Sequence, residues 1–464
     1  MRDLSSIIKA YDVRGVVPDQ WDSDLARDIG AAFVQVIKAG HEDGGPGAVV
    51  VGHDMRPTGP DLVAAFCDGV NGQGCDVIDI GMCSTDGLYF ASGRLGLPGA
   101  MFTASHNPAE YNGIKLCGPG ATPVGEDSGL ALIRDMVSQG PVPDRVVEPG
   151  TVRHRDMLAD YASFLRSLVD ISGIRPLKVV VDAGNGMGGY TVPAVLGTAA
   201  GLPELPITVI PLYFDLDGTF PNHEANPIEP ENLVDLQAKV RQLDADLGLA
   251  FDGDADRCFV VDDRGAIVSP SVITSLIAEQ VLAREPGATI IHNLITSRAV
   301  PELVTDAGGV PERTRVGHSF IKERMAATGA AFGGEHSGHF YFRDFWRADS
   351  GMLAALNVLA VLGSTPEGTT LSGLLDAYER YVSTGEINTT VSDVEAALDR
   401  VRRTFGDRGD VDDLDGVTVS TPDWWFNVRP SNTEPLLRLN AEAADPETLA
   451  ALRDEVIAVI EEAS

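Results

Sequence analysis

Met101-Phe-Thr-Ala-Ser-His-Asn-Pro108 is the stretch around which the rest of the chain can be organised. Asn107-Pro108 takes the backbone out of regular structure, because the residue before a proline is pushed away from the helical region. The mostly apolar run 97–102 leads into this turn, so we expect Ser105 on a tight, exposed loop that caps a strand at the edge of an α/β sheet. A serine there could act as a nucleophile, although Ser beside Asn-Pro is also ordinary turn chemistry.

Two bulk properties limit the architecture and the class of partner. The chain has 464 residues, which at about 100–200 residues per domain predicts roughly three or four domains. It carries 35 Lys and Arg against 68 Asp and Glu, for a net charge of -33. Such a field repels nucleic acid and anionic membrane surfaces, so neither is expected as a partner. An anionic substrate would need a local concentration of Arg, Lys or metal at its site.

Cysteine usage and hydropathy predict a cytoplasmic protein. The five cysteines are odd in number and form no Cys-x-x-Cys pair, which fits a reducing compartment better than a disulfide framework. No apolar signal core follows the N-terminal residues, and no run of about 18 apolar residues occurs in the chain.

The first hundred residues alternate between helical and strand patterns. Residues 24–39 and 59–70 have helical periodicity, whereas 48–52 and 77–81 are typical of buried strands. This alternation predicts a largely parallel or mixed sheet. The loop His53-Asp-Met-Arg-Pro57 follows the first of these strands, where it either presents side chains to a ligand or forms a solvated turn.

A glycine-rich turn follows a later strand, 177–182. Ala183-Gly-Asn-Gly-Met-Gly-Gly189 could cradle a phosphate at the start of a helix, or it could allow a close strand-to-helix crossing. Its spacing is not Gly-x-Gly-x-x-Gly, and no Gly-Lys-Ser/Thr follows. Close packing is therefore the better interpretation.

Three carboxylates follow the strand 247–251 in Asp252-Gly-Asp-Ala-Asp-Arg257. On an extended loop, side chains at alternate positions point the same way, and hard oxygen ligands of this kind suit Mg²⁺ or Ca²⁺. An EF-hand is excluded, because its sixth position must be Gly and here it is Arg257. The alternative is a solvated acidic turn. Arg257 would offset the negative charge and could also hold an anionic ligand.

Two polar, glycine-containing loops come next, Arg315-Val-Gly-His-Ser-Phe-Ile-Lys322 and Gly333-Gly-Glu-His-Ser-Gly-His339. A zinc site is disfavoured, since His336 and His339 lack the His-Glu-x-x-His frame, and hydrogen bonds to sugar hydroxyls fit the second loop better. Beyond residue 368 the pattern changes to a small α+β unit. There Arg429-Pro-Ser-Asn-Thr-Glu-Pro435 is either a phosphate clamp or an ordinary solvated turn.

Together these loops resemble the α-D-phosphohexomutase family, the phosphomannomutases and phosphoglucomutases. The four stretches that match the family's signature loops, in order, are Thr-Ala-Ser-His-Asn-Pro at 103–108, Asp-Gly-Asp-Ala-Asp-Arg at 252–257, Gly-Glu-His-Ser-Gly-His at 334–339 and Arg-Pro-Ser-Asn-Thr-Glu-Pro at 429–435. The resemblance spans nearly the whole chain.

The resemblance implies an α/β fold of three related α/β domains with mixed sheets and a C-terminal α+β domain, heart-shaped around a central cleft. The boundaries we expect are 1–150 for the domain with the phosphoserine loop, 151–255 for the metal loop, 256–368 for the sugar-binding loop and 369–464 for the phosphate-binding loop.

The same resemblance assigns roles to individual residues. Ser105 would be carried as phosphoserine, and its phosphate would join Asp252, Asp254 and Asp256 in holding Mg²⁺. Lys115 would be the general acid/base, with a pKa that a neighbouring cation and arginine should lower. Arg14 would be a further active-site arginine, and His106 would contact the phosphate without having to be the base. The substrate-binding residues implied are Arg257, Gly317, His318, Glu335, Ser337, His339, Arg429, Ser431, Asn432 and Thr433.

The implied reaction interconverts a hexose 6-phosphate and a hexose 1-phosphate through phosphoserine and a hexose 1,6-bisphosphate, which also serves as activator. Phosphomannomutase activity is expected, with dual phosphomannomutase and phosphoglucomutase activity as the broader form. Gly-Glu-His-Ser-Gly-His favours mannose or glucose, because phosphoglucosamine enzymes usually have Gln before that Ser. The alternatives are a phosphoglucosamine mutase, a metal-dependent sugar phosphatase and a catalytically silent sugar-phosphate-binding protein.

One departure from the family concerns residues 293–298. Some dual-specificity members carry a lysine there, whereas this chain has none, and Arg298 is the hypothetical substitute. The partner expected is a phosphosugar substrate. The sequence leaves open whether the protein is a monomer or a homodimer.

Overall fold

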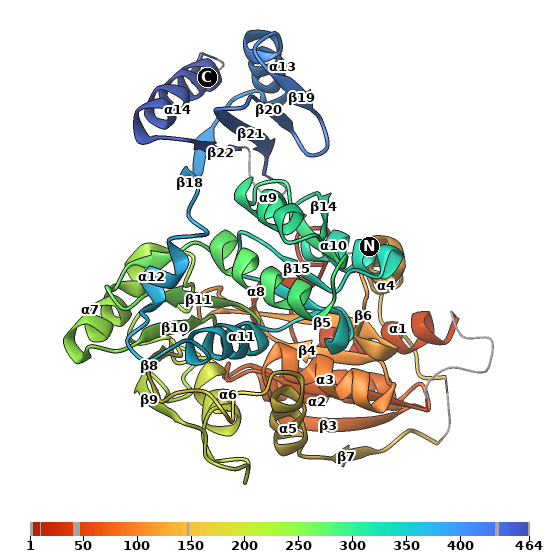
Figure 1. The fold of residues 1–464 in the computed structure, drawn as a ribbon. Coiled ribbons are helices and arrows are strands. Elements are labelled where there is room, and N and C mark those ends of the chain that lie inside the picture. The colour runs from red at the N-terminus through yellow and green to blue at the C-terminus, as the bar shows by residue number, and fades with distance from the viewer. Residues whose placement is uncertain (1–2, 10, 40–46, 146–147, 432–435, 463–464) are drawn as a thin grey trace. The chain divides into compact units, whose positions relative to one another are not determined.

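The computed structural model describes residues 3–9, 11–39, 47–145, 148–431 and 436–462 (Figure 1). The chain divides into two compact units. Unit 1 comprises Met1–Pro270 and Ser337–Leu374, and unit 2 comprises Ser271–His336 and Leu375–Ser464.

Unit 1 begins with a mixed seven-stranded sheet (Figure 1, red to orange). The strand order is β1 (Val13–Val16), β5 (Tyr111–Gly118), β4 (Gly99–Phe102), β2 (Ala48–His53), β3 (Asp76–Met82) and β7 (Val152–His154), with β6 (Thr122–Pro123) paired to β5. The strands β4, β2, β3 and β7 run parallel, and β5 is antiparallel to β4 and β1. The prediction of a parallel or mixed sheet is confirmed.

Helices cover both faces of this sheet. Alternation along β2 sends Val49 and Val51 into a core shared with α1 (Ser23–Ala39), α2 (Gly59–Asn71) and α4 (Leu130–Ser138). On the other face, α3 (Thr85–Leu95) lies over β4, where a Cβ on Gly99 would lie 3.5 Å from Leu88 Cδ2. The short helices η1 (Pro119–Ala121) and η2 (Glu126–Ser128) connect β5, β6 and α4.

The strand that leads to Ser105 lies inside the sheet. β4 has β2 on one side and β5 on the other, so the prediction of an edge strand is wrong. The residues that follow β2 remain hydrogen-bonded to the end of β4, because the Asp54 amide donates to the Phe102 carbonyl over 2.9 Å. The loop after His53 and the loop after Phe102 therefore leave the sheet at the same point.

Unit 1 contains a second sheet, and its strand at 247–251 leads into the three-aspartate loop. Its order is β12 (Ile267–Val268), β11 (Cys258–Val261), β10 (Leu247–Phe251), β8 (Leu177–Asp182) and β9 (Ile207–Leu212). β10, β8 and β9 are parallel, and β11 returns antiparallel to β10. The helical segments that follow or connect these strands are α5 (Leu158–Leu168), α6 (Gly188–Val195), η3 (Pro230–Leu233) and α7 (Val234–Leu243).

The glycine-rich turn 183–189 packs directly behind the aspartate loop. The Met187 amide donates to the Gly253 carbonyl over 2.8 Å, and a Cβ on Gly186 would lie only 2.6 Å from that same oxygen. The close-packing interpretation of these glycines is confirmed.

The last part of unit 1 is a hairpin followed by a buried helix. It contains β16 (Phe340–Phe342), η4 (Arg343–Phe345), β17 (Ala348–Asp349) and α11 (Gly351–Gly363). Trp346 anchors the hairpin, since its ring packs against Phe90 of α3 and Phe164 of α5 and covers Gly93, where a Cβ would lie 2.2 Å away.

Unit 2 contains two groups of strands. The parallel set is β14 (Val310–Thr314), β13 (Thr289–Asn293) and β15 (Phe332–Gly334), accompanied by α8 (Pro270–Arg284), α9 (Ala299–Asp306) and α10 (His318–Thr328). The antiparallel set is β18 (Val382–Thr390), β22 (Leu436–Ala443), β21 (Trp424–Pro430), β20 (Val417–Ser420) and β19 (Asp410–Asp412). The short helix α12 (Leu371–Leu375) precedes it.

Two helices pack on the antiparallel sheet, as expected for an α+β unit. α13 (Val394–Phe405) and α14 (Pro446–Glu461) are capped by the carboxylates of Asp393 and Asp445. Phe405 and Phe426 meet edge-on in their common core. Within the described residues, no helix is both long and apolar enough to cross a membrane.

Gly69→Ala should destabilise the first domain. A Cβ at Gly69 of α2 would lie 1.9 Å from the Arg27 carbonyl of α1, so the two helices must separate, at a cost of about 1–3 kcal/mol. We expect a lower midpoint of thermal unfolding by circular dichroism. Gly173→Ala is the control, because a Cβ there meets no atom within 4 Å. Equal midpoints for the two variants would contradict the close helix contact.

Candidate active site

Ser105 lies in the loop after β4 and points at the aspartate loop. Its Oγ donates to Asp252 Oδ2 over 2.7 Å, and its amide donates to Thr103 Oγ1 over 2.9 Å. The residue is only 5% exposed, so the prediction of an exposed loop is wrong. Gly253 explains the burial, because a Cβ there would lie 2.3 Å from the Ser105 carbonyl, and only glycine lets the two loops approach this closely.

Asp252, Asp254 and Asp256 converge from a tight turn. One carboxylate oxygen of each lies within 4.8 Å of those of the other two, and none of the side chains is more than 1% exposed. The loop is not extended as predicted, because Ala255 takes a positive φ of 58° and folds it into a turn. The burial also rules out the alternative of a solvated acidic turn.

The carboxylates suit a divalent cation. Among the described residues, Asp254 Oδ1 is buried and accepts no hydrogen bond, and Asp256 Oδ1 is buried with His339 Nε2 3.5 Å away. Buried anionic oxygens without a donor are costly unless a cation compensates them, and hard oxygen ligands are those that Mg²⁺ prefers. The residues present therefore fit the metal that the sequence predicted.

Two basic side chains already offset part of this charge. Lys115 reaches the cluster from β5, where it pairs with Met101 of β4, and its Nζ lies 2.7 Å from Asp254 Oδ2 and 2.6 Å from Asp256 Oδ2. Arg257 Nε donates to Asp252 Oδ2 over 2.9 Å. The register of β5 against β4 brings Lys115 to the aspartates, and Arg257 is placed there because it follows Asp256 in the same loop.

The environment moves the pKa values of two aspartates in opposite directions. Burial raises the pKa of Asp252, and the nearby Asp256 carboxylate adds to this against the effect of Arg257. Burial acts in the same sense on Asp256, but Lys115, His339 and Arg257 outweigh it and hold the pKa of Asp256 well below its ordinary value.

The expectation that a neighbouring cation lowers the pKa of Lys115 concerns the site with Mg²⁺ bound and stays a prediction, whereas the protein groups alone act in the other direction. Burial lowers the pKa of a lysine, but the contacts with Asp254 and Asp256 prevail and raise the pKa of Lys115 well above its ordinary value. Lys115 is thus an ammonium group between two carboxylates.

His106 is a neutral imidazole beside the serine. Burial, followed by the charges of Arg257 and Arg14, puts the pKa of His106 well below its ordinary value. Its Nδ1 therefore accepts a hydrogen bond from Arg257 Nη2 and lies 3.2 Å from Ser105 Oγ. Arg14 reaches the same loop through Asn107, donating to its Oδ1 over 2.7 Å.

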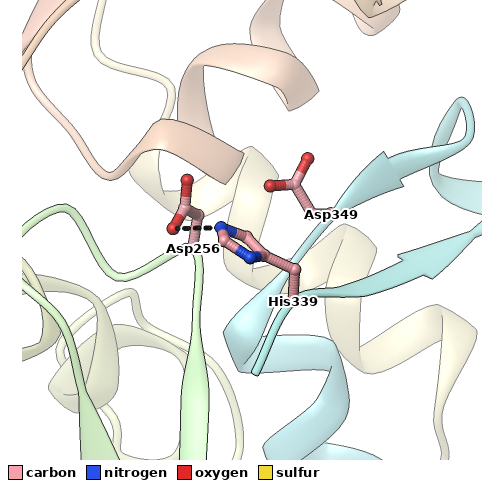
Figure 2. A group of neighbouring side chains, drawn as sticks. All are labelled: Asp256, His339 and Asp349. Carbon is pink, nitrogen blue, oxygen red and sulfur yellow. Dashed lines mark ion pairs between the residues drawn. The ribbon is translucent and has the colours of Figure 1, made fainter. Parts of the chain in front are cut away.

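Figure 2 shows a second group of potential metal ligands that shares Asp256. His339 Nε2 lies 3.5 Å from Asp256 Oδ1, while its Nδ1 is 2.8 Å from Ser337 Oγ. Asp349 enters from β17, and its carboxylate lies within 4.8 Å of the facing atoms of the other two. Sequence reasoning missed Asp349, because only the register of the β16–β17 hairpin brings it near His339.

Other predicted residues lie in unit 2. Glu335 is buried, and its Oε1 accepts hydrogen bonds from the Gly317 amide over 3.3 Å and from Asn293 Nδ2 over 3.2 Å. His318 is the first residue of α10. The strand pairing of β13 with β15 is what brings Asn293 near Glu335.

Arg429 shares a carboxylate with a second arginine. Arg429 Nη2 lies 2.6 Å from Glu386 Oε2, and Arg438 Nη1 lies 3.0 Å from Glu386 Oε1. Arg438 also donates to Ser431 Oγ over 3.4 Å. The sequence did not single out Glu386 or Arg438. The pairing of β18 with β22 brings these two residues together. The predicted Asn432 and Thr433 lie outside the described residues.

Arg298 does not replace a substrate-binding lysine. Its Nη1 donates to the Pro422 carbonyl over 2.8 Å, and its Nη2 donates to the Thr421 carbonyl over 2.9 Å. The guanidinium is used to tie the start of α9 to the antiparallel sheet, so that hypothesis is wrong.

The start of α3 supports the aspartate loop, which the sequence did not reveal. The Thr85 amide donates to the Asp254 carbonyl over 3.0 Å, and Thr85 Oγ1 donates to Asp254 Oδ2 over 2.5 Å. The neighbouring Asp86 is buried and accepts from Ser350 Oγ and Tyr161 OH, and burial raises the pKa of Asp86 to about 6. The Ser-Thr-Asp run at a helix start was the available signal.

Comparison with known families agrees with this geometry. Profiles described as phosphoglucomutase/phosphomannomutase alpha/beta/alpha domains I, II and III match residues 5–140, 159–265 and 269–381. The profile of the C-terminal domain of the same family matches residues 386–459. The chain belongs to the phosphoglucomutase/phosphomannomutase family. The prediction of four domains, three α/β and one α+β, is confirmed.

Relatives of this phosphohexomutase match over nearly their whole length. A protein of Xanthomonas campestris pv. campestris named phosphohexose mutases is 41% identical over 97% of both chains. The phosphomannomutase/phosphoglucomutase of Pseudomonas aeruginosa is 40% identical over 96% of this chain and 93% of its own. A crystal structure of a family protein from Burkholderia thailandensis has a TM-score of 0.87 at 35% identity, covering 99% of this chain and 97% of its own.

Asp254→Asn should weaken divalent-cation binding. The substitution removes one anionic oxygen from the cluster, so we expect a loss of affinity exceeding the ~10–100-fold that is typical of losing an outer-shell partner. Titration calorimetry with Mg²⁺, or Mn²⁺ binding by electron paramagnetic resonance, measures this without turnover.

Asp182→Asn is the matched control for that titration. Asp182 is equally buried in unit 1, but it pairs with His223 at 3.1 Å and lies outside the cluster. Parental cation affinity in Asp254→Asn would show that the cluster is not the cation site.

Proposed function

We propose that this phosphohexomutase interconverts mannose 6-phosphate and mannose 1-phosphate, and also acts on the glucose phosphates. The observation that carries the proposal is the 2.7 Å hydrogen bond from Ser105 Oγ to Asp252, inside a buried carboxylate cluster. That arrangement supports a serine that holds a phosphoryl group beside a cation. The names of the relatives support the choice of sugar over a phosphoglucosamine mutase or a phosphatase.

In the proposed cycle, Ser105 lends its phosphoryl group and later regains one. The ester bond at Ser105 Oγ breaks as a sugar hydroxyl oxygen bonds to phosphorus, which gives a hexose 1,6-bisphosphate. After this intermediate turns around, its other phosphate returns to Ser105 and the isomeric monophosphate leaves. Added hexose 1,6-bisphosphate should act as an activator, because it transfers a phosphoryl group to Ser105 when that serine is unphosphorylated.

The aspartates and arginines would provide the charge that such a transfer requires. Asp252, Asp254, Asp256 and a phosphate oxygen on Ser105 would hold Mg²⁺, which when bound neutralises negative charge on the transferred group. Arg257 Nη2 lies 3.5 Å from Ser105 Oγ, where it can bind a phosphate oxygen. Neutral His106 accepts from this guanidinium and thereby orients it.

Lys115 would move the proton. As an ammonium group it would donate a proton to Ser105 Oγ when the first transfer breaks the Oγ–phosphorus bond, while the attacking sugar hydroxyl releases its proton to solvent. In the return step the resulting amine would take the proton of the Ser105 hydroxyl, while the sugar oxygen that leaves phosphorus takes a proton from solvent. Its position at 2.6–2.7 Å from Asp254 and Asp256 supports this role, because the two carboxylates fix Nζ beside the serine loop.

The remaining predicted residues would bind the substrate. We assign Glu335, Ser337, Gly317, His318 and His339 to the sugar and its neighbouring phosphate, with Arg14 beside the serine loop. Arg429, Ser431, Asn432 and Thr433 would hold the phosphate that does not react. The cross-strand pair of Arg429 and Arg438, which share Glu386, supports this, because guanidinium groups bind phosphate oxygens well.

Organisation and location are part of the proposal. We propose four domains that start near the expected positions 1, 151, 256 and 369, with the second boundary moved beyond residue 265 and the third beyond residue 381, because the family matches for domains II and III extend to these residues. The cysteines Cys67, Cys75, Cys83, Cys117 and Cys258 are all free and buried, which supports a reducing compartment. We propose a cytoplasmic enzyme that acts as a monomer or homodimer.

Ser105→Ala should abolish interconversion of mannose 1-phosphate and mannose 6-phosphate. The variant lacks the oxygen that carries the phosphoryl group, and adding the 1,6-bisphosphate should not rescue it. A coupled assay of both directions measures this, with Ser167→Ala, an exposed serine of α5, as control.

The parent protein should be assayed with mannose, glucose and glucosamine phosphates side by side. We expect turnover of the first two to exceed that of glucosamine phosphate. Release of inorganic phosphate without isomerisation would identify a phosphatase and contradict the proposal, as would full mutase activity in Ser105→Ala.

Lys115→Met should lower kcat by ~10²–10⁴-fold, the usual contribution of general acid–base catalysis. Steady-state kinetics at saturating bisphosphate measures it. Lys178→Met is the control, because Lys178 is an exposed lysine of β8 that donates to the Leu243 carbonyl. A kcat within a few-fold of the parent for Lys115→Met would refute the role.

A further inference from the structure

Arg56 lies under the serine loop and has no part in the roles assigned above. It belongs to the loop His53-Asp-Met-Arg-Pro57, which the sequence predicted to be either a ligand-facing loop or a solvated turn. Neither interpretation is correct, because Arg56 is 1% exposed and Asp54 is fully buried. The question is what a buried guanidinium does at this position.

The guanidinium binds the backbone of the serine loop at four points. Its Nη2 donates to the Ser105 carbonyl over 2.9 Å and to the Asn107 carbonyl over 2.6 Å. Its Nη1 donates to the Pro108 carbonyl over 2.7 Å and to the Tyr111 carbonyl over 2.8 Å. One planar, charged group therefore fixes the direction of four carbonyls within seven residues.

The serine loop needs such support because its conformation is unfavourable. Ser105 has a positive φ of 50°, which is unfavourable for a residue with a Cβ and persists only when the surroundings enforce it. The Ser105 carbonyl that Arg56 binds is the same oxygen that packs against Gly253. Turning this peptide would therefore move Ser105 Oγ away from Asp252.

Arg56 is itself held from two other directions. Asp54 Oδ2 lies 3.3 Å from Arg56 Nε, and the ring of Phe220 lies 5.2 Å from the guanidinium carbon. Burial raises the pKa of Asp54 and lowers the pKa of Arg56, and each residue opposes the shift of the other. The Cα of Arg56 also lies 2.7 Å from where a Cβ on Gly218 would sit.

We propose that Arg56 is a positioning residue for phosphoryl transfer, which sets the backbone of residues 105–111 so that Ser105 Oγ faces the aspartate cluster. The inference rests on the proposed function of Ser105. Arg56 acts through backbone oxygens and is therefore distinct from the catalytic residues. Its loss should impair the transfer step, whereas substrate binding by residues of the other loops should persist.

The test compares Arg56→Lys with Arg166→Lys. A lysine keeps the charge but cannot bind four carbonyls in one plane. Arg166 is the matched control, since its guanidinium donates to the carbonyls of Val195 at the end of α6 and of Gly197 and Pro203 in the segment that follows, all in the same unit. We expect Arg56→Lys to lower kcat by ~10²-fold with KM nearly unchanged, as misplacement of reacting groups does. Arg166→Lys should keep the parental kcat.

Amide hydrogen exchange gives a second readout that does not require turnover. Peptides covering residues 103–112 should exchange faster in Arg56→Lys than in the parent and in Arg166→Lys. If Arg56→Lys does not fold, Asp54→Asn takes its place, because it releases one side of the guanidinium, and it should show a smaller loss of kcat together with faster exchange of the same peptides.

The outcomes separate this inference from the proposed function. A parent without mutase activity would refute the proposed function, and the exchange of residues 103–112 would then still decide the inference. An active parent with parental kcat in the folded Arg56 variant, or in Asp54→Asn where that replaces it, would overturn the inference. Unchanged exchange of the 103–112 peptides in that variant would overturn it as well.

Discussion

The burial of three carboxylates beside one serine is the constraint on which unit 1 depends. Asp252, Asp254 and Asp256 are shielded from water, and leaving one buried charge without its partner typically costs about 3–5 kcal/mol. The surrounding elements supply cations that compensate this charge. β5 supplies Lys115, and the end of the metal loop supplies Arg257. Within the described part of the chain Asp254 Oδ1 has no hydrogen-bond donor, and it is an oxygen that a divalent cation would bind.

The local charge reconciles an acidic protein with an anionic substrate. A net charge of -33 disfavours phosphate binding at long range, so the sequence required a local concentration of basic groups or metal. Such a concentration is found around Ser105, where Arg14, Lys115 and Arg257 lie within the reach of one loop. The negative net charge of the whole protein would still repel extended polyanions, which cannot be bound at a single basic site.

Much of the fold could be predicted from the sequence, and much of the positioning could not. Apolar runs located β2 and β10, and period-3.6 patterns located α1 and α2, because these signals are local. The buried state of Ser105 could not be predicted, since it depends on Gly253 in the loop between β10 and β11 of another sheet. Asp349, Thr85 and Arg56 were missed or left undecided for the same reason: strand register and inter-loop contacts position them. Arg298 was misjudged, because an arginine that binds backbone carbonyls cannot be distinguished in sequence from one that binds substrate.

The central claim is that Ser105 and the aspartate cluster form one phosphoryl-transfer centre. The most direct measurement is rapid-quench mass spectrometry of the peptide containing residues 101–108, taken while the enzyme turns over mannose 1-phosphate. The account predicts phosphate on Ser105, formed and consumed at least as fast as the steady-state turnover. Turnover without phosphate on Ser105, or with the phosphate on another residue, would contradict it.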